Sequence, residues 1–340
     1  MYPRNESLEM SPAMSRPSGK MTLAGVRKGV LSSPIRALIY GVEGVGKSSF
    51  AACAPNPIFL CSEAGTNYLD VSRFATADSF NDVQDALQVL IDEEHPYEST
   101  VIDTLDWLEP FVWRTVVKNA SPNKEGKRPK SIDEVGGGYN KGYEVALDYW
   151  RQFLSKLETL RTVKGMHVIL ISHAWVKPFS NPAGPDFDRY ELKLHKKAAG
   201  LFKEWADDVL FATFDTYTST QKGETKGRQG ATRIIHTEHR ATHDAKNRCG
   251  LPEQLPLNWG SYFSAWKARQ ARPMGEMAAE LKSLLAILGK SDKLEDTLRY
   301  VGTDTTRMAN MLNKARFEVD QHNARFDNVD DGKLLADVAS

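Results

Sequence analysis

The chain alternates short apolar runs with longer stretches in which apolar residues recur at helical spacing. The apolar runs predict strands at Ile35–Tyr40, Ile58–Cys61, Thr100–Ile102, His167–Ser172 and Asp208–Phe214. The amphipathic stretches predict helices at Lys47–Ala54, Phe80–Glu93, Asp106–Asn119 and Gly142–Thr162. This alternation indicates an α/β fold. Strands that are apolar almost throughout favour a mostly parallel central sheet flanked by helices.

Two segments interrupt the alternation. Residues 118–141 and 174–200 are polar, contain several Gly and Pro, and exceed the length of ordinary connections. We therefore expect them to be functional or mobile loops. After Thr213 the pattern becomes that of a hairpin, because FATFDTYTST and ATRIIHTEHR flank a Gly-rich turn. Residues 275–318 predict two or three further helices.

These patterns divide the chain into four parts. We expect a flexible N-terminal arm at 1–25, an α/β core at 26–268, a small C-terminal helical region at 269–320 and an acidic flexible tail at 321–340.

Composition excludes several classes of protein. The 340 residues contain 44 Lys and Arg against 44 Asp and Glu, so the net charge is zero. A globally basic nucleic-acid coat is excluded, and a charged partner must bind a local patch. The 3 cysteines are too few for a disulfide framework. No apolar run approaches the roughly 20 residues that cross a bilayer, and the first residues lack the apolar segment of a secretory signal. We expect a cytoplasmic protein.

The strongest motif is a complete G-x-x-x-x-G-K-S loop between a predicted strand and a predicted helix. Its glycines turn backbone N–H groups toward a polyphosphate, and the helix N-terminus adds partial positive charge. Lys47 is expected to reach the β- and γ-phosphates, and the Ser48 hydroxyl is expected to ligate Mg²⁺. The predicted nucleotide-binding residues are Gly41, Val42, Glu43, Gly44, Val45, Gly46, Lys47, Ser48 and Ser49.

Three later strands end in polar side chains near this loop. Asp103 can hold Mg²⁺ or cap the following helix. Glu63 can polarise the water that attacks the γ-phosphate, or be an exposed strand-end acid. His173 can bind the γ-phosphate and report the nucleotide to residues 174–200, or be an ordinary strand-end histidine. Asp106 and Glu109 are interpreted as acids favoured at a helix start.

This order of motifs resembles the RecA-like ATPase core. It is similar to the phage-encoded group of small RecA-like proteins that includes the Sak-type single-strand annealing ATPases. The stretches that carry the resemblance are LIYGVEGVGKSSF, IFLCSEAG, STVIDTLDWL, HVILISHAW and AKNRCGLP, across roughly residues 30–255. The resemblance implies ATP and Mg²⁺ as cofactors and, for a phage-encoded protein, the host cytoplasm.

The resemblance also implies roles for individual residues. Glu63 takes the place of the catalytic glutamate, Asp103 that of the Mg²⁺-side aspartate, and His173 that of a γ-phosphate-sensing glutamine. Lys246 and Arg248 are similar to the Lys-x-Arg pair of RadA-type recombinases, which reaches the γ-phosphate of a neighbouring subunit; a solvated basic turn is the alternative. The pair implies a ring or filament homo-oligomer.

In RecA-like proteins, loops at the positions of 118–141 and 174–200 line the DNA path. Both segments here interleave cations with aromatic side chains, a composition that suits single-stranded DNA. Loops whose lysines only keep the surface soluble are the alternative. The predicted DNA-binding residues are Lys124, Lys127, Arg128, Lys130, Tyr139, Trp175, Lys177, Lys193, Lys196 and Lys197.

Together these features predict an ATP-dependent DNA recombination protein that binds single-stranded DNA and promotes annealing or strand pairing. One alternative is a ring-forming, helicase-like DNA motor with the same ATP site. Another is a nucleotide-switched scaffold whose loops and C-terminal helices bind protein. A single-strand-binding protein is a further candidate partner for those helices.

Overall fold

The computed structural model describes residues 33–322, apart from 63, 183, 222–223, 271–273, 303–306, 309–310, 313, 317 and 320–321. The strands are β1 (Arg36–Gly41), β2 (Pro57–Cys61), β3 (Ser72–Arg73), β4 (Ser99–Asp103), β5 (His167–Phe179), β6 (Phe187–Leu192), β7 (Asp208–Gln221), β8 (Glu224–His236), β9 (Lys246–Asn247) and β10 (Gln254–Pro256). The α-helices are α1 (Lys47–Ala52), α2 (Phe80–Asp92), α3 (Leu105–Asn119), α4 (Lys141–Val163), α5 (Lys196–Trp205), α6 (Trp259–Gln270), α7 (Met274–Ile287) and α8 (Leu294–Val301). Short 3₁₀ turns are η2 (Ala64–Thr66), η3 (Ile132–Gly137) and η4 (Ser291–Lys293).

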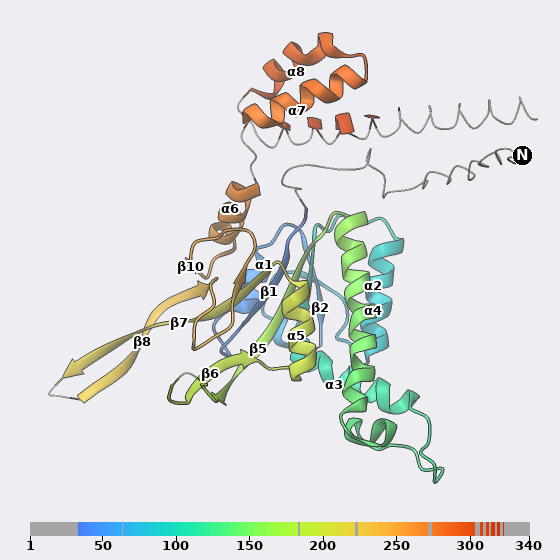
Figure 1. The fold of residues 1–340 in the computed structure, drawn as a ribbon, viewed down its shortest axis with the longest axis vertical. Coiled ribbons are helices and arrows are strands. Elements are labelled where there is room, and N and C mark those ends of the chain that lie inside the picture. Colours follow the sequence, from blue (N-terminus) through green and yellow to red (C-terminus); the bar gives the residue numbers. More distant parts are fainter. Residues whose placement is uncertain are drawn as a thin grey trace, which may run out of the picture. The chain divides into compact units, whose positions relative to one another are not determined.

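The central sheet has the strand order β10-β8-β7-β1-β5-β4-β2-β3 (Figure 1). From β7 to β3 every neighbouring pair is parallel, whereas β8 and β10 are antiparallel additions at one side. Strand β1 therefore has a parallel partner on each side, and β5 separates it from β4. The predicted α/β class, with a mostly parallel central sheet flanked by helices, is confirmed.

Helices cover both faces of the sheet (Figure 1). Each face carries its own apolar cluster. On one face, Trp150 and Phe153 of α4 pack against Phe202 of α5 beneath the sheet strands. On the other, Phe50 of α1 packs edge-on against Trp259 of α6, with ring centroids 5.3 Å apart. Covering both faces explains why the inner strands are apolar at nearly every position.

The predicted helices form within two residues of their expected ends. The prediction of a loop at residues 174–200 is wrong. Strand β5 continues past the sheet to Phe179 and returns antiparallel as β6, and α5 begins at Lys196. Packing between Phe179 and Phe187, whose ring centroids lie 5.2 Å apart, stabilises the tip of this arm. The hairpin predicted after Thr213 is confirmed as β7–β8.

The C-terminal helices have a core of their own. Met277, Leu281 and Leu285 of α7 pack with Val301 of α8 and with Leu312. The predicted arm at 1–25 and most of the predicted tail lie outside the described residues. In the part of the chain that the structure describes, no helix is both long and apolar enough to span a membrane.

Candidate active site

The phosphate loop leaves the sheet at the end of β1 and turns into α1. Gly44 and Gly46 adopt positive φ angles of 71° and 103°, which an L side chain rarely tolerates. The Lys47 side chain is buried, and its Nζ donates hydrogen bonds to the carbonyl oxygens of Gly41 at 3.1 Å and Val42 at 2.9 Å. The backbone therefore has the form that receives a polyphosphate at a helix N-terminus.

The Mg²⁺ ligands predicted from sequence lie together. Asp103 ends β4 and is buried, and its carboxylate bonds the Ser48 side chain at the start of α1. Burial raises the pKa of Asp103, while the Ser48 hydroxyl and the nearby His173 and Lys47 oppose that rise. A hydroxyl and a carboxylate side by side fit the oxygen ligands that Mg²⁺ takes beside a bound phosphate.

These side chains surround a cavity of about 300 Å³. Of the predicted residues, the cavity is lined by Gly44, Gly46, Lys47, Ser48, Ser49, Asp103 and His173. Glu63 lies outside the described residues, so its catalytic role stays a prediction. Gly65, two residues further on, does line the cavity, which places the end of β2 at this site.

His173 is held in place by Asp106, which was interpreted from the sequence only as an acid favoured at a helix start. The Asp106 carboxylate accepts the backbone N–H of His173 and bonds its Nδ1, each at 2.9 Å. Burial works against ionisation of Asp106, but the bonds from His173 outweigh it and lower the pKa of Asp106. An ionised Asp106 holds the proton of the ring on Nδ1, which leaves Nε2 for other partners.

Several residues that line the cavity were not predicted from the sequence, and Tyr68 and Arg233 are two of them. Tyr68 follows η2 and is fully exposed at the rim, and Arg233 comes from β8, far away in sequence. Neither belongs to a motif, and no local pattern points to the cavity. The position of Arg233 depends on β8 joining the sheet beside β7.

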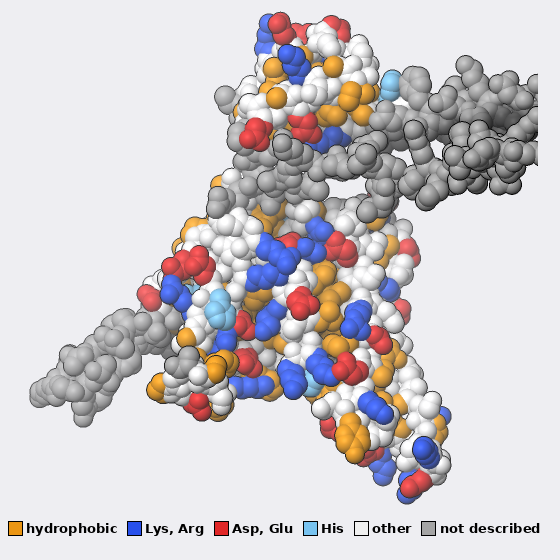
Figure 2. All heavy atoms as spheres, in the orientation of Figure 1, with side chains coloured by type: hydrophobic (Ala, Val, Ile, Leu, Met, Phe, Trp, Pro, Cys, Tyr) orange, Lys and Arg blue, Asp and Glu red, His pale blue; other side chains and the backbone are white. Residues whose placement is uncertain are grey.

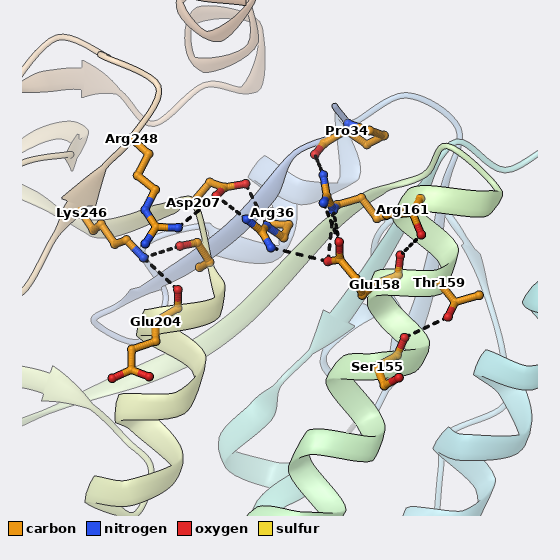
Figure 3. A network of polar contacts seen from close by, with 12 residues as sticks. Pro34, Arg36, Ser155, Glu158, Thr159, Arg161, Glu204, Asp207, Lys246 and Arg248 are labelled. Carbon is orange, nitrogen blue, oxygen red and sulfur yellow. Dashed lines mark hydrogen bonds and ion pairs between the residues drawn. The ribbon is translucent and has the colours of Figure 1, made fainter. Parts of the chain in front are cut away.

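Lys246 and Arg248 are not at this cavity; Figure 3 shows them beside Asp207 and Arg36. Strand β9 pairs with the first residues of β7, at the amino ends of the strands, whereas the phosphate loop follows their carboxyl ends. The four residues of β1 between these levels span about 13 Å. The pair therefore has no contact with the phosphate loop of its own chain.

The two cations also differ from one another. Lys246 Nζ donates to the carbonyls of Lys203, Glu204 and Ala206, at 2.8, 3.1 and 2.6 Å, and so caps the C-terminus of α5 (Figure 3). Arg248 is exposed and lies 3.5 Å from Asp207, whose carboxylate already binds Arg36 at two positions. Of the two, Arg248 has the side chain that a neighbouring molecule can reach.

The predicted DNA-binding residues fall into two groups. Lys124, Lys127, Arg128 and Lys130 line a groove of about 1340 Å³ between α3 and α4, and Tyr139 lies nearby with its ring 95% exposed. Trp175 and Lys177 lie on the β5–β6 arm, and Lys193, Lys196 and Lys197 lie at the start of α5. In Figure 2, Lys and Arg side chains lie interspersed with acidic ones over the part of the molecule where Figure 1 shows β6 and α5.

Acidic neighbours reduce the charge of this surface. Lys193 Nζ lies 3.9 Å from Glu43 of the phosphate loop, and Lys177 Nζ lies 3.9 Å from Glu191. Lys177 also stands 3.8 Å from the ring centroid of Trp175, a cation–π contact. Lys197 is paired directly with Glu144. The surface thus combines exposed aromatic rings with cations that are partly neutralised by acids.

Comparison with known proteins gives one family match for the chain, over the segment that contains the cavity. Residues 33–249 match the family model described as AAA domain. Among solved structures, the crystal structure of the RadB recombinase is similar, with a TM-score of 0.34 and 10% sequence identity; the match covers 62% of this chain and 84% of that one. No curated protein matches the chain.

Proposed function

Because the chain belongs to the AAA domain family, whose model matches residues 33–249, we propose that its P-loop ATPase domain drives a DNA recombination step. The protein binds single-stranded DNA and promotes annealing or strand pairing while it hydrolyses ATP. Nucleotide binding follows from family membership and the phosphate loop. The choice of ATP, the DNA substrate and the recombination step are the proposal.

At the ATP site, backbone N–H groups from Gly44 to Ser48 bind the phosphates, and Lys47 moves from its loop carbonyls to them. Ser48 and Asp103 would hold Mg²⁺, and a bound Mg²⁺ would supply positive charge beside the phosphate oxygens. His173 meets the terminal phosphate through Nε2. Glu63, two residues after β2 in the sequence, is proposed to orient the attacking water.

One observation carries the DNA-binding proposal: the strand that holds His173 in the cavity is the same strand that forms the arm. Trp175 and Lys177 follow His173 by two and four residues on β5. The arm is also fastened at its base, where Lys193 N donates to the His173 carbonyl at 2.9 Å. A change at His173 upon loss of the γ-phosphate therefore moves the arm directly.

A ring or filament that hydrolyses ATP at subunit interfaces is part of the proposal. Arg248 lies near the amino ends of the strands, away from the phosphate loop of its own chain at their carboxyl ends, so in this proposal it reaches a γ-phosphate in trans only. Loss of an arginine with this role typically slows hydrolysis severely, because the arginine stabilises the negative charge that develops on the phosphate in the transition state. The C-terminal helices are also the proposed contact for a single-strand-binding protein or another subunit.

The test is ATP turnover with and without a single-stranded oligonucleotide, at two salt concentrations. We expect stimulation that fades as salt rises, because phosphate contacts release counterions. The matched control is the Lys47→Ala protein, which should lack turnover under every condition. ATP turnover that is the same with and without DNA at both salt concentrations would contradict a role for DNA and favour a nucleotide-switched protein scaffold. Directional unwinding of duplex DNA would favour a helicase-like motor.

A further inference from the structure

Arg233 is a cation in the nucleotide cavity that no motif accounts for. It lines the same cavity as Lys47, Ser48 and Asp103. A methyl group added at Gly46 would come within 2.9 Å of its Nη1, so the guanidinium lies against the phosphate loop itself. The pocket for a polyanion thus has a second fixed cation from a different part of the chain.

The backbone of Arg233 is held in place by the sheet. Arg233 pairs with Phe214 of β7, and its carbonyl accepts a hydrogen bond from Leu257 N at 2.9 Å. The guanidinium also lies over the Phe214 ring, 5.9 Å from its centroid. An arginine anchored in this way presents its donors with less loss of side-chain freedom than one on a loop.

The side of the cavity on which Arg233 lies indicates which phosphate group of the nucleotide it contacts. Strand β8 lies on the β7 side of β1, whereas β5 and β4, which carry His173 and Asp103, lie on the other side. The terminal phosphate belongs at His173 and Asp103, where the Mg²⁺ ligands are. The opposite side of the loop is left for the phosphate next to the ribose.

We propose that Arg233 binds the nucleoside-proximal phosphates of the nucleotide within its own subunit, as a fixed cation of the ground-state complex. This inference rests on the nucleotide site of the proposed function and deepens it. Because Arg233 is in β8, it also ties the bound nucleotide to the β7–β8 ribbon. Its role differs from that of Arg248, which is expected to act on another subunit.

The experiment compares the dissociation constants of ADP and ATP, with Mg²⁺, for the wild type, Arg233→Ala, Arg233→Lys and Lys47→Ala. We expect Arg233→Ala to weaken ADP and ATP equally, by about tenfold or more, because charge-assisted bonds to phosphate are strong. Arg233→Lys should recover part of the loss, since it restores charge without the bidentate fork. The control is Arg151→Ala, which removes an exposed arginine of α4.

The outcomes separate this inference from the function on which it rests. Unchanged affinity in Arg233→Ala, with loss in Lys47→Ala, would overturn the role of Arg233 and leave the nucleotide site intact. A loss confined to ATP would overturn its placement at the ribose side of the triphosphate. Unchanged affinity in Lys47→Ala would contradict the nucleotide site itself. Circular dichroism of each variant checks that the fold is retained.

Discussion

The carboxylate of Asp106 holds His173 at two points, the backbone N–H and the ring Nδ1, both at 2.9 Å. The side chain of Asp106 is nearly inaccessible to solvent and the His173 ring is only slightly more open, at the wall of the nucleotide cavity. A buried carboxylate that orients a histidine in this way fixes which ring nitrogen faces the ligand. Asp106 is therefore a positioning residue for His173.

We predict that Asp106→Asn lowers ATP turnover by about tenfold or more, because the amide no longer holds the Nδ1–H tautomer. Binding of ADP should stay within error of the wild type, since His173 lies on the side of the terminal phosphate. The factor by which turnover falls should be the same across the pH range, because the lowered pKa of Asp106 keeps its carboxylate ionised throughout. Steady-state kinetics from pH 5.5 to 8.5 measures the factor and its pH dependence.

The control for that change is Asp148→Asn, which removes an exposed carboxylate of α4 that pairs with Arg151. Asp148→Asn should leave turnover and its pH profile unchanged. If Asp106→Asn also matched the wild type in turnover, Asp106 would have only a structural role at the start of α3.

The cations Lys246 and Arg248 form one motif in sequence, but we predict different consequences for their loss. Lys246→Ala should lower the free energy of unfolding by about 1 kcal/mol, because three carbonyls at the end of α5 lose their donor. Arg248→Ala should leave stability nearly unchanged, since its ion pair is exposed. Urea denaturation of both variants measures the difference.

Arg248→Ala should instead lower ATP turnover by at least about a hundredfold if it acts on a neighbouring subunit. Mixing Arg248→Ala with Lys47→Ala subunits then tests the trans arrangement. At some interfaces of the mixture, an intact Arg248 meets an intact phosphate loop, so part of the activity should return. A mixture as inactive as its two components would contradict a trans role.

The arm residues Trp175 and Lys177 should contribute to DNA binding by different physics. Trp175→Ala is expected to weaken an oligo-thymidine complex by about 1–3 kcal/mol at every salt concentration, because stacking is not electrostatic. Lys177→Ala should reduce the slope of log affinity against log salt by about 0.7, since one phosphate contact is lost. Fluorescence anisotropy across a salt series separates the two effects.

The matched aromatic control is Tyr300→Ala, which removes an exposed ring of α8. It should leave both the affinity and the salt slope unchanged. Equal losses for Tyr300→Ala and Trp175→Ala would indicate general weakening and not a DNA contact on the arm.

The parts of the site that could be predicted from the sequence are those marked by a motif within a few residues of the side chain concerned. The phosphate loop and Asp103 each follow an apolar strand directly, so motif and context are read within a few residues. Arg233 carries no such signal, because its position depends on the β7–β8 pairing and on the order of strands around β1. The Asp106–His173 contact likewise joins residues 67 positions apart that only the β4–β5 pairing brings together.

The fold shows the same division. Helical spacing predicts α2 and α4 to within two residues, because the apolar residues of each helix recur on one face and pack into the same buried cluster. The β5–β6 arm was interpreted as a loop because its exposed strands carry polar and charged residues and contain Pro178. Pairing between the two strands of the arm, and not burial, holds it in a strand conformation.

The last prediction concerns Glu109, a buried acid on α3. Both of its carboxylate oxygens accept the backbone N–H of His195, just before α5, at 3.0 Å. Burial raises the pKa of Glu109 to about 7, although the His195 bond lowers it in part and Asp106 adds repulsion. The carboxyl therefore keeps its proton in the folded state at a pH where the unfolded chain, with its ordinary pKa of 4.5, has released it.

A raised carboxyl pKa means that stability is lost as pH rises from about 4.5 to 7, by at most about 3 kcal/mol from this group. We predict that Glu109→Gln, which cannot ionise, has a flatter dependence of its urea midpoint on pH between 5 and 7.5 than the wild type has. The exposed Glu93→Gln change is the control and should keep the wild-type dependence. A Glu109→Gln protein with that same dependence would show that Glu109 titrates no higher in the folded chain than in the unfolded one.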